Sequence, residues 1–398
     1  MTTKQLIPPE DGRADTILKR IMLFRKIGCQ VTVFSFLSQS VELNQFCTVI
    51  NIPFRINVVS IIVGILKRRP LQVALYSGKG LIRELQSRLD KNKYDVIISD
   101  MIRTALLIKD SSIPRKILDM DDVLSSRYLR QISTPGLINS LGNSPVQLPV
   151  ILRYFEHTLI KLALRYEAYS LKKFENKIVY KYDRVVLVSQ KEAEELKKET
   201  GYNNISIIPN YINFPVIETI TNKNKYIDLL FFGNLSIAHN IDTAIYLIQE
   251  LFPAIKKVIP DVNFSMIGRK ISPIIFQEAQ KNDNISLYEN VFNIVPFIQG
   301  SRICLSPMRF GSGIKTKILE ALYLGTPVIT TSRGAEGIPE AKECMIIADT
   351  LEEQINNVVA ILKDDVDIKS MIMKARQIMN QHFTEKSVEN KLRQLLED

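Results

Sequence analysis

The chain has 398 residues, of which 46% are apolar and 24% charged, an ordinary composition for a globular protein of about two domains. This apolar content excludes a wholly disordered chain, and 16 glycines without any repeat exclude a collagen-like or solenoid protein. The four cysteines form no CxxC pair, so we expect neither a disulfide framework nor a zinc site, which suits a reducing cytosol. These cysteines, expected to be small buried side chains, are Cys29, Cys47, Cys304 and Cys344.

The net charge of +10 lies in the first half of the chain. Residues 1–212 carry 32 lysines and arginines against 20 acidic side chains, whereas residues 213–398 carry 20 against 22. Three kinds of partner fit a basic half: nucleic acid, an anionic lipid surface and a phosphate-bearing substrate. We expect no nucleic acid, because no recognition motif is present, tryptophan is absent and aromatic residues do not alternate with basic ones.

No segment has the pattern of a secretory signal or of a membrane-spanning helix. The first twelve residues are polar and proline-rich, and the longest apolar run, Ile56–Leu66, is far shorter than the roughly 20 residues that a spanning helix needs. Lys67, Arg68 and Arg69 follow this run directly. The combination fits a segment that rests on an anionic membrane surface, and it also fits a core segment with a solvated end.

Short β-branched runs alternate with amphipathic segments in the first half, which predicts parallel strands covered by helices. The expected strands are Val31–Phe36, Val96–Ser99, Lys116–Leu118, Val185–Val188 and Ile205–Ile208. One or two long helices are expected from Leu148 to Arg184, where apolar residues recur at three- and four-residue steps. These apolar residues are Leu152, Phe155, Leu159 and Leu162. The other side is basic, so this stretch lies in a membrane interface or packs on a domain with its basic face in water.

A polar break with nearby prolines separates the two halves. Pro209, Pro215 and the run Asn222-Lys-Asn-Lys mark it, so we expect a first domain at 1–212 and a second from 213 onward. The pattern then restarts with strands at Ile227–Phe232, Val262–Ile267, Ser301–Leu305 and Val328–Thr331, and with a helix at Ile241–Val258. Both halves are predicted to be doubly wound α/β domains, whose ligands bind beyond the carboxyl ends of the strands.

The most informative segment runs from Pro307 to Gly337 and reads PMRFGSGIKTKILEALYLGTPVITTSRGAEG. A strand enters the glycine-rich turn Gly311-Ser312-Gly313, and a helix is expected from about Ile314 to Leu324. Glycines let backbone N–H groups approach a ligand, and a helix N-terminus favours an anion. We therefore expect an anionic group to bind at this turn.

Two lysines are predicted in the first turn of that helix. Lys315 and Lys317 would oppose the helix dipole there, a mismatch that a bound phosphate would offset. Helical spacing places Gly313, Thr316, Lys317 and Glu320 on one face, so a cation and a carboxylate point to the same place. A carboxylate there suits the two hydroxyls of a ribose. The alternative is a solvated Lys–Glu pair on the helix surface.

This segment resembles the donor-binding motif of the retaining, nucleotide-sugar-dependent glycosyltransferases with the GT-B fold (glycosyltransferase family 4-like, group 1). KILEALYLGTPVITT matches closely, and FFGNLSIAHNIDTAIYL, NFSMIGRK and NISLYENV resemble the preceding strands, turns and helix of the nucleotide domain. DRVVLVSQKEAEEL and IIPNYI resemble the last strands before the interdomain linker. The resemblance implies two Rossmann-like domains that face across a cleft, the second at 213–382, with a C-terminal helix, residues 383–398, that crosses back to the first.

The resemblance also implies a donor site. Glu320 would bind the ribose, the Gly311–Gly313 turn the diphosphate, and Val291 would lie near the base, while Gly233 and Gly268 allow close approach. The donor-binding residues that we expect are Gly233, Asn234, His239, Gly268, Arg269, Val291, Gly311, Ser312, Gly313, Lys315, Thr316, Lys317 and Glu320.

The sequence departs from the family pattern at several of these positions. Where many members carry the first of two glutamates, this chain has Ser312. The family's diphosphate-binding arginine and lysine fall on Asn234 and His239, so we expect Lys315, Lys317 and Arg309 to replace them. The usual first strand, before the loop that ends at Gly12 and Arg13, is short or absent.

On the acceptor side, the family pattern places Asp121 near a position often held by histidine, facing the reacting sugar. We therefore expect Asp121 and Glu320 as catalytic residues, and Gly12, Arg13, Arg103, Asp122 and Arg127 as acceptor-binding ones. Arginines suit an acceptor phosphate because they bind it through two parallel hydrogen bonds. The carboxylates of Asp119-Met-Asp121-Asp122 alternatively cap the next helix, and a metal-binding DxD is not expected, since that motif serves another glycosyltransferase fold.

The implied function is transfer of a sugar from a nucleotide-diphosphate sugar to a glycan or lipid-linked acceptor with retained anomeric configuration. No cofactor and no metal are expected. The expected location is the cytoplasm, with the protein either free or peripheral on the inner face of the membrane. A catalytically silent GT-B subunit that binds a partner enzyme or a glycan is the main alternative, favoured by Ser312, Asn234 and His239. Another GT-B enzyme, such as a sugar-nucleotide epimerase, is a third reading.

Overall fold

The computed structural model describes residues 1–9, 12–133, 156–212, 226–311 and 313–397. The chain divides into two compact units. The first comprises Met1–Leu129, Leu162–Asn210 and Lys386–Asp398, and the second comprises Arg130–Lys161 and Tyr211–Glu385. The last helix, α19 (Glu385–Glu397), is therefore almost wholly part of the first unit, where Arg115 donates to the carbonyl of Leu396 at 2.6 Å and Lys26 pairs with Glu389 at 3.1 Å.

A four-stranded parallel sheet of order β3-β4-β5-β6 forms the centre of the first unit. Its strands are β3 (Val96–Asp100), β4 (Arg115–Asp121), β5 (Arg184–Leu187) and β6 (Ile205–Ile207), and a separate parallel pair is formed by β1 (Thr32–Ser35) and β2 (Thr48–Asn51). All four expected strands of this sheet and the strand at β1 are confirmed to within three residues at each end. The β2 strand was not expected from the sequence.

The first two residues connect these two sheets. The N–H of Thr2 donates to the carbonyl of Phe34 at 2.9 Å, and its carbonyl accepts from Phe36, beside β1. On the other side, the N–H of Asp100 donates to the carbonyl of Met1 at 3.2 Å, beside β3. A very short stretch of chain thus satisfies backbone groups that the missing first strand would otherwise leave unpaired.

The helices of the first unit are largely amphipathic. They are α1 (Gly12–Lys26), α2 (Val58–Leu66), α3 (Leu71–Leu75), α4 (Lys79–Leu89), α5 (Ala105–Ile108), α10 (Gln190–Thr200), most of α6 (Leu124–Ser133) and most of α9 (Glu156–Ile178). Gly12, expected in a loop, is the first residue of α1. Of the two alternatives for the run Ile56–Leu66, the core segment is excluded, since most of its side chains are exposed. Leu162 is also exposed, on α9. Residues 148–155 lie outside the described part of the chain.

A six-stranded, all-parallel sheet forms the centre of the second unit, in the order β12-β11-β10-β7-β8-β9. The strands are β7 (Ile227–Asn234), β8 (Phe264–Arg269), β9 (Ile285–Glu289), β10 (Ser301–Ser306), β11 (Val328–Thr330) and β12 (Ile346–Ile347). Central strands are apolar on both faces, as burial of a parallel sheet between helices requires; Phe231 and Phe232, successive residues of β7, are both fully buried.

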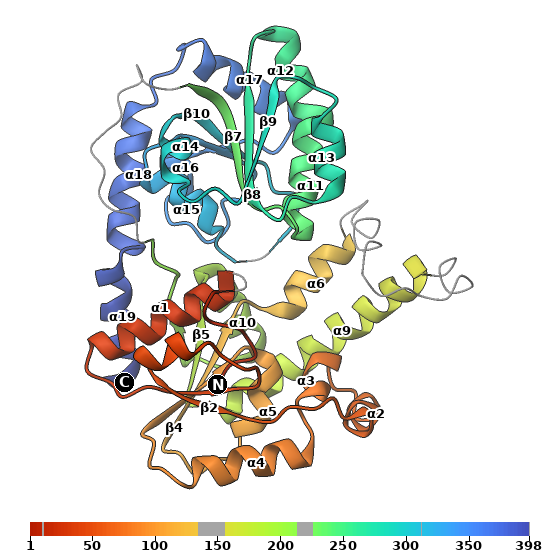
Figure 1. The fold of residues 1–398 in the computed structure, drawn as a ribbon, viewed down its shortest axis with the longest axis vertical. Coiled ribbons are helices and arrows are strands. Elements are labelled where there is room, and N and C mark those ends of the chain that lie inside the picture. The colour runs from red at the N-terminus through yellow and green to blue at the C-terminus, as the bar shows by residue number, and fades with distance from the viewer. Residues whose placement is uncertain (10–11, 134–155, 213–225, 312, 398) are drawn as a thin grey trace. The chain divides into compact units, whose positions relative to one another are not determined.

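Helices cover both faces of this sheet (Figure 1). The helices α14 (Val295–Gln299), α15 (Thr316–Tyr323), α16 (Ala341–Cys344) and α18 (Lys369–His382) contribute to one core, and α11 (Ala238–Tyr246), α12 (Phe252–Val258), α13 (Pro273–Ala279) and α17 (Leu351–Leu362) to the other. The helix expected at Ile241–Val258 is interrupted by a π-helical turn at Leu247–Leu251.

Across the described residues, none of the helices is both long enough and apolar enough to pass through a membrane. Three cysteines are buried as expected, whereas Cys29 is only half-buried.

Candidate functional site

The strand order of the second unit reverses beside β7. From β7 the chain first adds β8 and β9 on one side and then β10, β11 and β12 on the other. In a doubly wound sheet this reversal opens a crevice at the carboxyl ends of the two strands that flank it, here β7 and β10. The strand β7 ends in Gly233 and Asn234, and the chain after β10 leads to Gly311 and Gly313. The two glycine turns singled out in the sequence therefore meet at one edge of the sheet.

The helix after β10 begins later than expected. It starts at Thr316, so Lys315 is its N-cap residue, with extended backbone, rather than a residue of the first turn. The delay follows from Gly311 and Gly313, whose positive φ angles of 124° and 66° hold the chain in a non-helical turn. No side chain caps the N-terminus of α15 by a hydrogen bond. The first N–H groups of the helix thus remain suited to an anion.

Lys317 is the most unusual cation of this edge. Its side chain is buried, its ammonium donates to Oδ1 of Asn240 at 2.5 Å, and it lies 4.3 Å from the ring centre of Phe231. Burial, with a smaller effect of the nearby charge of Lys315, lowers the pKa of Lys317 to about 7, against the raising effects of Cys304 and Glu320. An anion placed here would restore the full charge of the lysine.

The glycines leave room for the two lysines. A Cβ at Gly233 would lie 3.3 Å from Nδ2 of Asn240 and 3.9 Å from Nζ of Lys317. A Cβ at Gly311 would lie 3.3 Å from Cε of Lys315, whose ammonium donates to the carbonyl of Gly313 at 2.5 Å. Gly233 thus lies beside the Lys317 ammonium and Gly311 beside the Lys315 side chain. Lysine ammonium groups and backbone N–H groups at a glycine-rich turn are the groups that bind phosphate oxygens.

Glu320 follows Lys317 by one turn of α15 and is half-buried. The two side chains interact electrostatically, since Glu320 raises the pKa of Lys317, and both act on the buried thiol of Cys304 in β10. The expected juxtaposition of a carboxylate with a cation is thus present. The face is not a solvated one, because Lys317 is buried.

Asn240 was missed by the sequence analysis, which chose His239. The Nδ2 of Asn240 donates to the carbonyl of Asn234 at 2.8 Å while its Oδ1 accepts from Lys317. His239 is half-buried, 6.2 Å from the ring of Phe310. The sequence did contain a signal for Asn240. It shares one helical face with Thr243, Ala244 and Leu247, so it is expected to be buried. A buried polar side chain beside a glycine turn needs a hydrogen-bond partner.

Other residues of the expected donor set lie nearby with local roles. The Asn234 side chain accepts from the N–H and the hydroxyl of Ser236. Arg309 pairs with Asp242 through both carboxylate oxygens. Thr316 opens α15, and Ser312 lies outside the described residues.

Three residues belong to the β8–β9 side of the crevice. A Cβ at Gly268 would lie 2.5 Å from Cγ of Leu235 and 2.7 Å from the carbonyl oxygen of Gly233, so glycine is needed for close packing. Arg269 is exposed, and Val291 is half-buried against the core.

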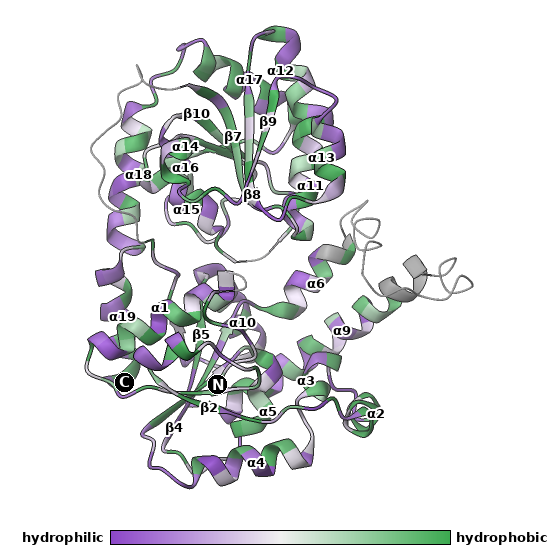
Figure 2. Cartoon of the chain, in the orientation of Figure 1, coloured by the Kyte–Doolittle hydropathy of each residue, from purple (hydrophilic) through white to green (hydrophobic). Residues whose placement is uncertain are grey.

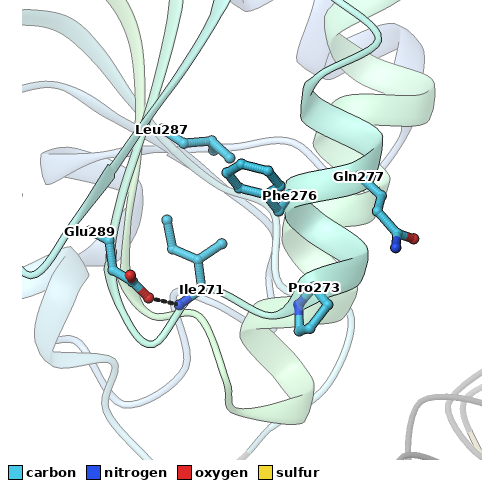
Figure 3. Close-up of a pocket in the computed structure, with 6 residues that line it drawn as sticks. All are labelled: Ile271, Pro273, Phe276, Gln277, Leu287 and Glu289. Atoms are coloured by element: carbon cyan, nitrogen blue, oxygen red, sulfur yellow. Dashed lines mark hydrogen bonds between the residues drawn. The ribbon is translucent and has the colours of Figure 1, made fainter.

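A separate pocket opens between α13 and the edge strand β9 (Figure 3). Its volume is about 380 Å³, and its lining residues are Ile271, Pro273, Phe276, Gln277, Leu287 and Glu289. Glu289 accepts from the N–H of Ile271 at 2.7 Å across its mouth. The two lysines of the glycine turn do not line this pocket.

In the first unit, two of the expected residues, Arg13 and Asp121, belong to a buried ionic cluster at the carboxyl ends of β3 and β4. The guanidinium of Arg13 lies 2.8 Å from Asp100, 2.8 Å from Asp119 and 3.0 Å from Asp121. Arg20 also pairs with Asp119 and donates to the carbonyl of Ile208 at 2.9 Å. Arg13 is thus held by three carboxylates of its own unit, which offset the cost of burying its charge.

Asp121 is the most accessible carboxylate of this cluster, with 24% of its side chain exposed against 6% for Asp100 and Asp119. Its φ angle of 67° is left-handed, a strained conformation for aspartate. Burial raises the pKa of Asp121, and Asp122 and Asp119 raise it further, against the opposing effect of Arg13.

The remaining expected residues are more dispersed. Asp122 is buried, with Arg127 at 3.5 Å, and Arg103 donates to the sulfur of Met101 at 3.1 Å. Glu175, which the sequence analysis did not single out, accepts from the N–H of Ser125 in the first turn of α6, and burial raises its pKa to about 7. Within the described residues, no three histidine, cysteine or acidic side chains are grouped so that they could hold a metal ion.

Part of the second unit matches a known protein family. Residues 227–364 match the family described as "Glycosyl transferases group 1". Over 95% of the chain and 93% of the relative, the sequence is 24% identical to an uncharacterized 44.6 kDa protein in the cps region of Klebsiella pneumoniae.

Solved structures share the fold at low sequence identity. Anabaena HepE in complex with UDP has a TM-score of 0.64 at 13% identity, over 96% of this chain and 95% of that one. Sucrose-phosphate synthase from Thermosynechococcus elongatus has a TM-score of 0.63 at 13% identity, over 97% and 93%. S. aureus TarM has a TM-score of 0.58 at 12% identity, over 80% of this chain and 58% of its own.

The two parallel α/β units and these likenesses define a protein of the GT-B fold. Residues 227–364 of the second unit match the glycosyl transferases group 1 family.

Proposed function

We propose that this protein is a glycosyltransferase that moves a sugar from a nucleotide-diphosphate sugar to a glycan or lipid-linked acceptor in cell-surface polysaccharide synthesis, with retention of anomeric configuration. The observation that carries the proposal is the gathering of Lys315, Lys317 and the N-terminus of α15 beside two glycine turns. Such a site fits a diphosphate, because lysine ammonium groups and backbone N–H groups bind phosphate oxygens.

The proposed donor and acceptor are suggested by the proteins that this chain is similar to. HepE is described in complex with UDP and glucose, and the pneumococcal O-GlcNAc transferase GtfA with UDP and GlcNAc. The relative from a cps region favours a polysaccharide acceptor. We therefore propose a UDP-linked hexose as the first donor to test and a growing glycan as the acceptor.

In the proposed reaction, the bond between the anomeric carbon and the diphosphate oxygen breaks, and an acceptor oxygen bonds to the same face of that carbon. The acceptor proton passes to a phosphate oxygen of the leaving diphosphate. Lys315, Lys317 and the α15 N–H groups stabilise the charge that develops on the leaving group. Because these groups supply positive charge, the proposed reaction needs no metal ion.

Glu320 is proposed to accept hydrogen bonds from the ribose hydroxyls and Asp121 to face the reacting sugar. Gly233, Gly311 and Gly313 let the donor approach the backbone, and Asn240 holds Lys317 in place.

The test is a thermal-shift screen of the parent chain and Glu320→Ala against UDP, GDP, ADP, CMP and their common sugar conjugates. A ligand that binds only the native state must raise the melting temperature. We expect one nucleotide to stabilise the parent selectively and the variant much less. No shift with any nucleotide would favour the alternative of a catalytically silent subunit. That alternative is suggested by Asn234 and His239, which stand where the family has its diphosphate-binding arginine and lysine.

A further inference from the structure

The short helix α2 carries an apolar face that no described part of the chain covers. Val59, Ile62 and Leu66 are 68%, 52% and 78% exposed. Other apolar side chains exposed in and just before this helix are Ile56, Val58, Val63 and Ile65. Figure 2 shows the helix in hydrophobic colours almost all round. A surface helix normally turns such residues toward a core, so this exposure indicates an interaction site.

The exposed face is held outward by packing on the other side. A Cβ at Gly64 would lie 2.3 Å from Cβ of Ala74, so α2 approaches α3 through its glycine. The hydroxyl of Tyr166 in α9 donates to the carbonyl of Arg69 at 2.9 Å, just after α2. Glu167 accepts from the N–H of Leu71, the first residue of α3, at 2.6 Å. These contacts fix α2 and α3 against α9.

Basic side chains surround the apolar face. Arg55, Lys67 and Arg68 are exposed at the two ends of α2, and no acidic residue occurs between positions 43 and 83. On α9, Lys173 lies 4.5 Å from the ring centre of Tyr169, which is 60% exposed, and Arg68 acts electrostatically on the same ring.

The acidic residues of α9 nearest to this region do not offset that charge at the surface. Glu167 and Glu175 are both buried, whereas Leu162 and Arg165 are exposed. Apolar and basic side chains therefore share one surface of the first unit.

We propose that α2, with Arg55, Lys67, Arg68, Tyr169 and Lys173, docks the protein on an anionic lipid surface. We call these residues the docking surface. At nine residues α2 is too short to span a bilayer, so it would lie in the interface with its apolar side chains among the acyl chains. The surrounding cations would contact anionic headgroups. A second copy of the chain is a poorer occupant, because its own cations would face these.

The experiment is sedimentation of the full chain with vesicles of phosphatidylcholine alone and of phosphatidylcholine with about 30% phosphatidylglycerol, at low and high salt. One variant, Ile62→Glu/Leu66→Glu, removes apolar character from α2. Its matched control, Val366→Glu/Met373→Glu, changes two exposed apolar residues of the second unit. A charge variant, Lys67→Glu/Arg68→Glu/Lys173→Glu, is matched by Lys342→Glu/Lys363→Glu/Lys369→Glu, which reverses three exposed lysines elsewhere.

We expect the parent and both controls to bind the anionic vesicles, and each docking-surface variant to lose at least about tenfold in affinity. Binding of the parent should weaken as salt rises. The inference is overturned if the parent binds neither vesicle, or if both docking-surface variants bind as well as the parent.

Two further readouts identify other occupants. A lowered melting temperature of Ile62→Glu/Leu66→Glu would show that another segment of the chain covers α2, and a parent dimer that this variant makes monomeric would show a self-interface. Either result, together with absent vesicle binding, overturns the docking surface. The donor-site experiments do not depend on this outcome, because the docking surface belongs to the first unit and the glycine turns to the second.

Discussion

The ammonium of Lys317 lies 2.5 Å from the side-chain oxygen of Asn240 and 4.3 Å from the ring centre of Phe231. Neither group carries a negative charge, so burial lowers the lysine pKa to about 7. A diphosphate bound at the glycine turn would favour the protonated form. The protonation of one lysine is therefore coupled to donor binding.

We expect nucleotide affinity to fall as the pH rises above 7. Below pH 7 the lysine is already protonated and binding needs no proton, whereas above pH 7 each binding event must take one up. The slope should approach a tenfold loss per pH unit. Calorimetric titrations at pH 6 to 9 would measure it. Lys317→Met should bind weakly and without this slope, whereas Lys257→Met, which removes an exposed lysine of α12, should behave as the parent.

The same lysine makes the unliganded fold more stable at alkaline pH. Its pKa is about 7 in the folded chain and near 10.5 when unfolded, so between these values the unfolded state binds more protons. Where that holds, the free energy of unfolding rises with pH. Denaturant titrations at pH 7 and 9 should show a rise in the parent that Lys317→Met lacks. Equal pH dependence of the two proteins would contradict the buried, shifted lysine.

Glu320 should contribute to affinity only when the ligand carries ribose hydroxyls. Hydrogen bonds to a carboxylate contribute about 1.5–3 kcal/mol, so we expect Glu320→Ala to lose roughly ten- to hundredfold in affinity for the selected nucleoside diphosphate. The 2′,3′-dideoxy analogue should bind the parent and the variant alike. Its binding is the control, and a loss of equal size for both ligands would indicate a general disturbance of α15.

The sequence predicted the local features of this fold well. Strand positions and the turn at Gly311–Gly313 follow from short apolar runs and glycines, which act over a few residues. The juxtaposition of Lys317 with Glu320 follows from helical spacing alone. These features need no knowledge of distant contacts.

The sequence could not predict contacts between distant segments. Asp100 and Arg13 are 87 positions apart, and Glu175 meets Ser125 across 50. The sequence likewise could not predict that α2 is exposed, because an apolar run does not indicate whether other segments of the chain cover it. The helix start at Thr316 was misjudged because positive φ at Gly313 delays it.

Replacement of Gly268 by alanine should destabilise the second unit. The added Cβ would lie 2.7 Å from the Gly233 carbonyl oxygen, a backbone atom that cannot move without disturbing β7. We expect a loss of about 1–3 kcal/mol in the free energy of unfolding. Gly80→Ala in α4 is the control, since nothing lies within 4 Å of its Cβ position and alanine favours a helix. A stability change of Gly268→Ala no larger than that of the control would show that β7 and β8 lie farther apart.

Substitutions in the ionic cluster around Arg13 should distinguish residues that stabilise the fold from residues that act in catalysis. Arg13→Ala leaves Asp100, Asp119 and Asp121 without their shared cation, which should cost about 3–5 kcal/mol of unfolding free energy. Asp121→Asn removes the most exposed of the three carboxylates, and asparagine tolerates the left-handed backbone there. Its stability should therefore change by less than about 1 kcal/mol, since the two arginines Arg13 and Arg20 still face two carboxylates.

Asp121→Asn should nevertheless lower turnover if Asp121 faces the reacting sugar, as we propose. The measurement is sugar transfer to an acceptor glycan at saturating donor, beside nucleotide affinity and denaturant stability of the same variant. We expect kcat to fall while nucleotide affinity and stability stay at parent levels. Asp122→Asn, beside it but buried near Arg127, is the comparison, because it should reduce stability. Unchanged kcat in Asp121→Asn would assign this carboxylate to the ionic cluster alone, since a group facing the transferred sugar acts on the charge that develops there.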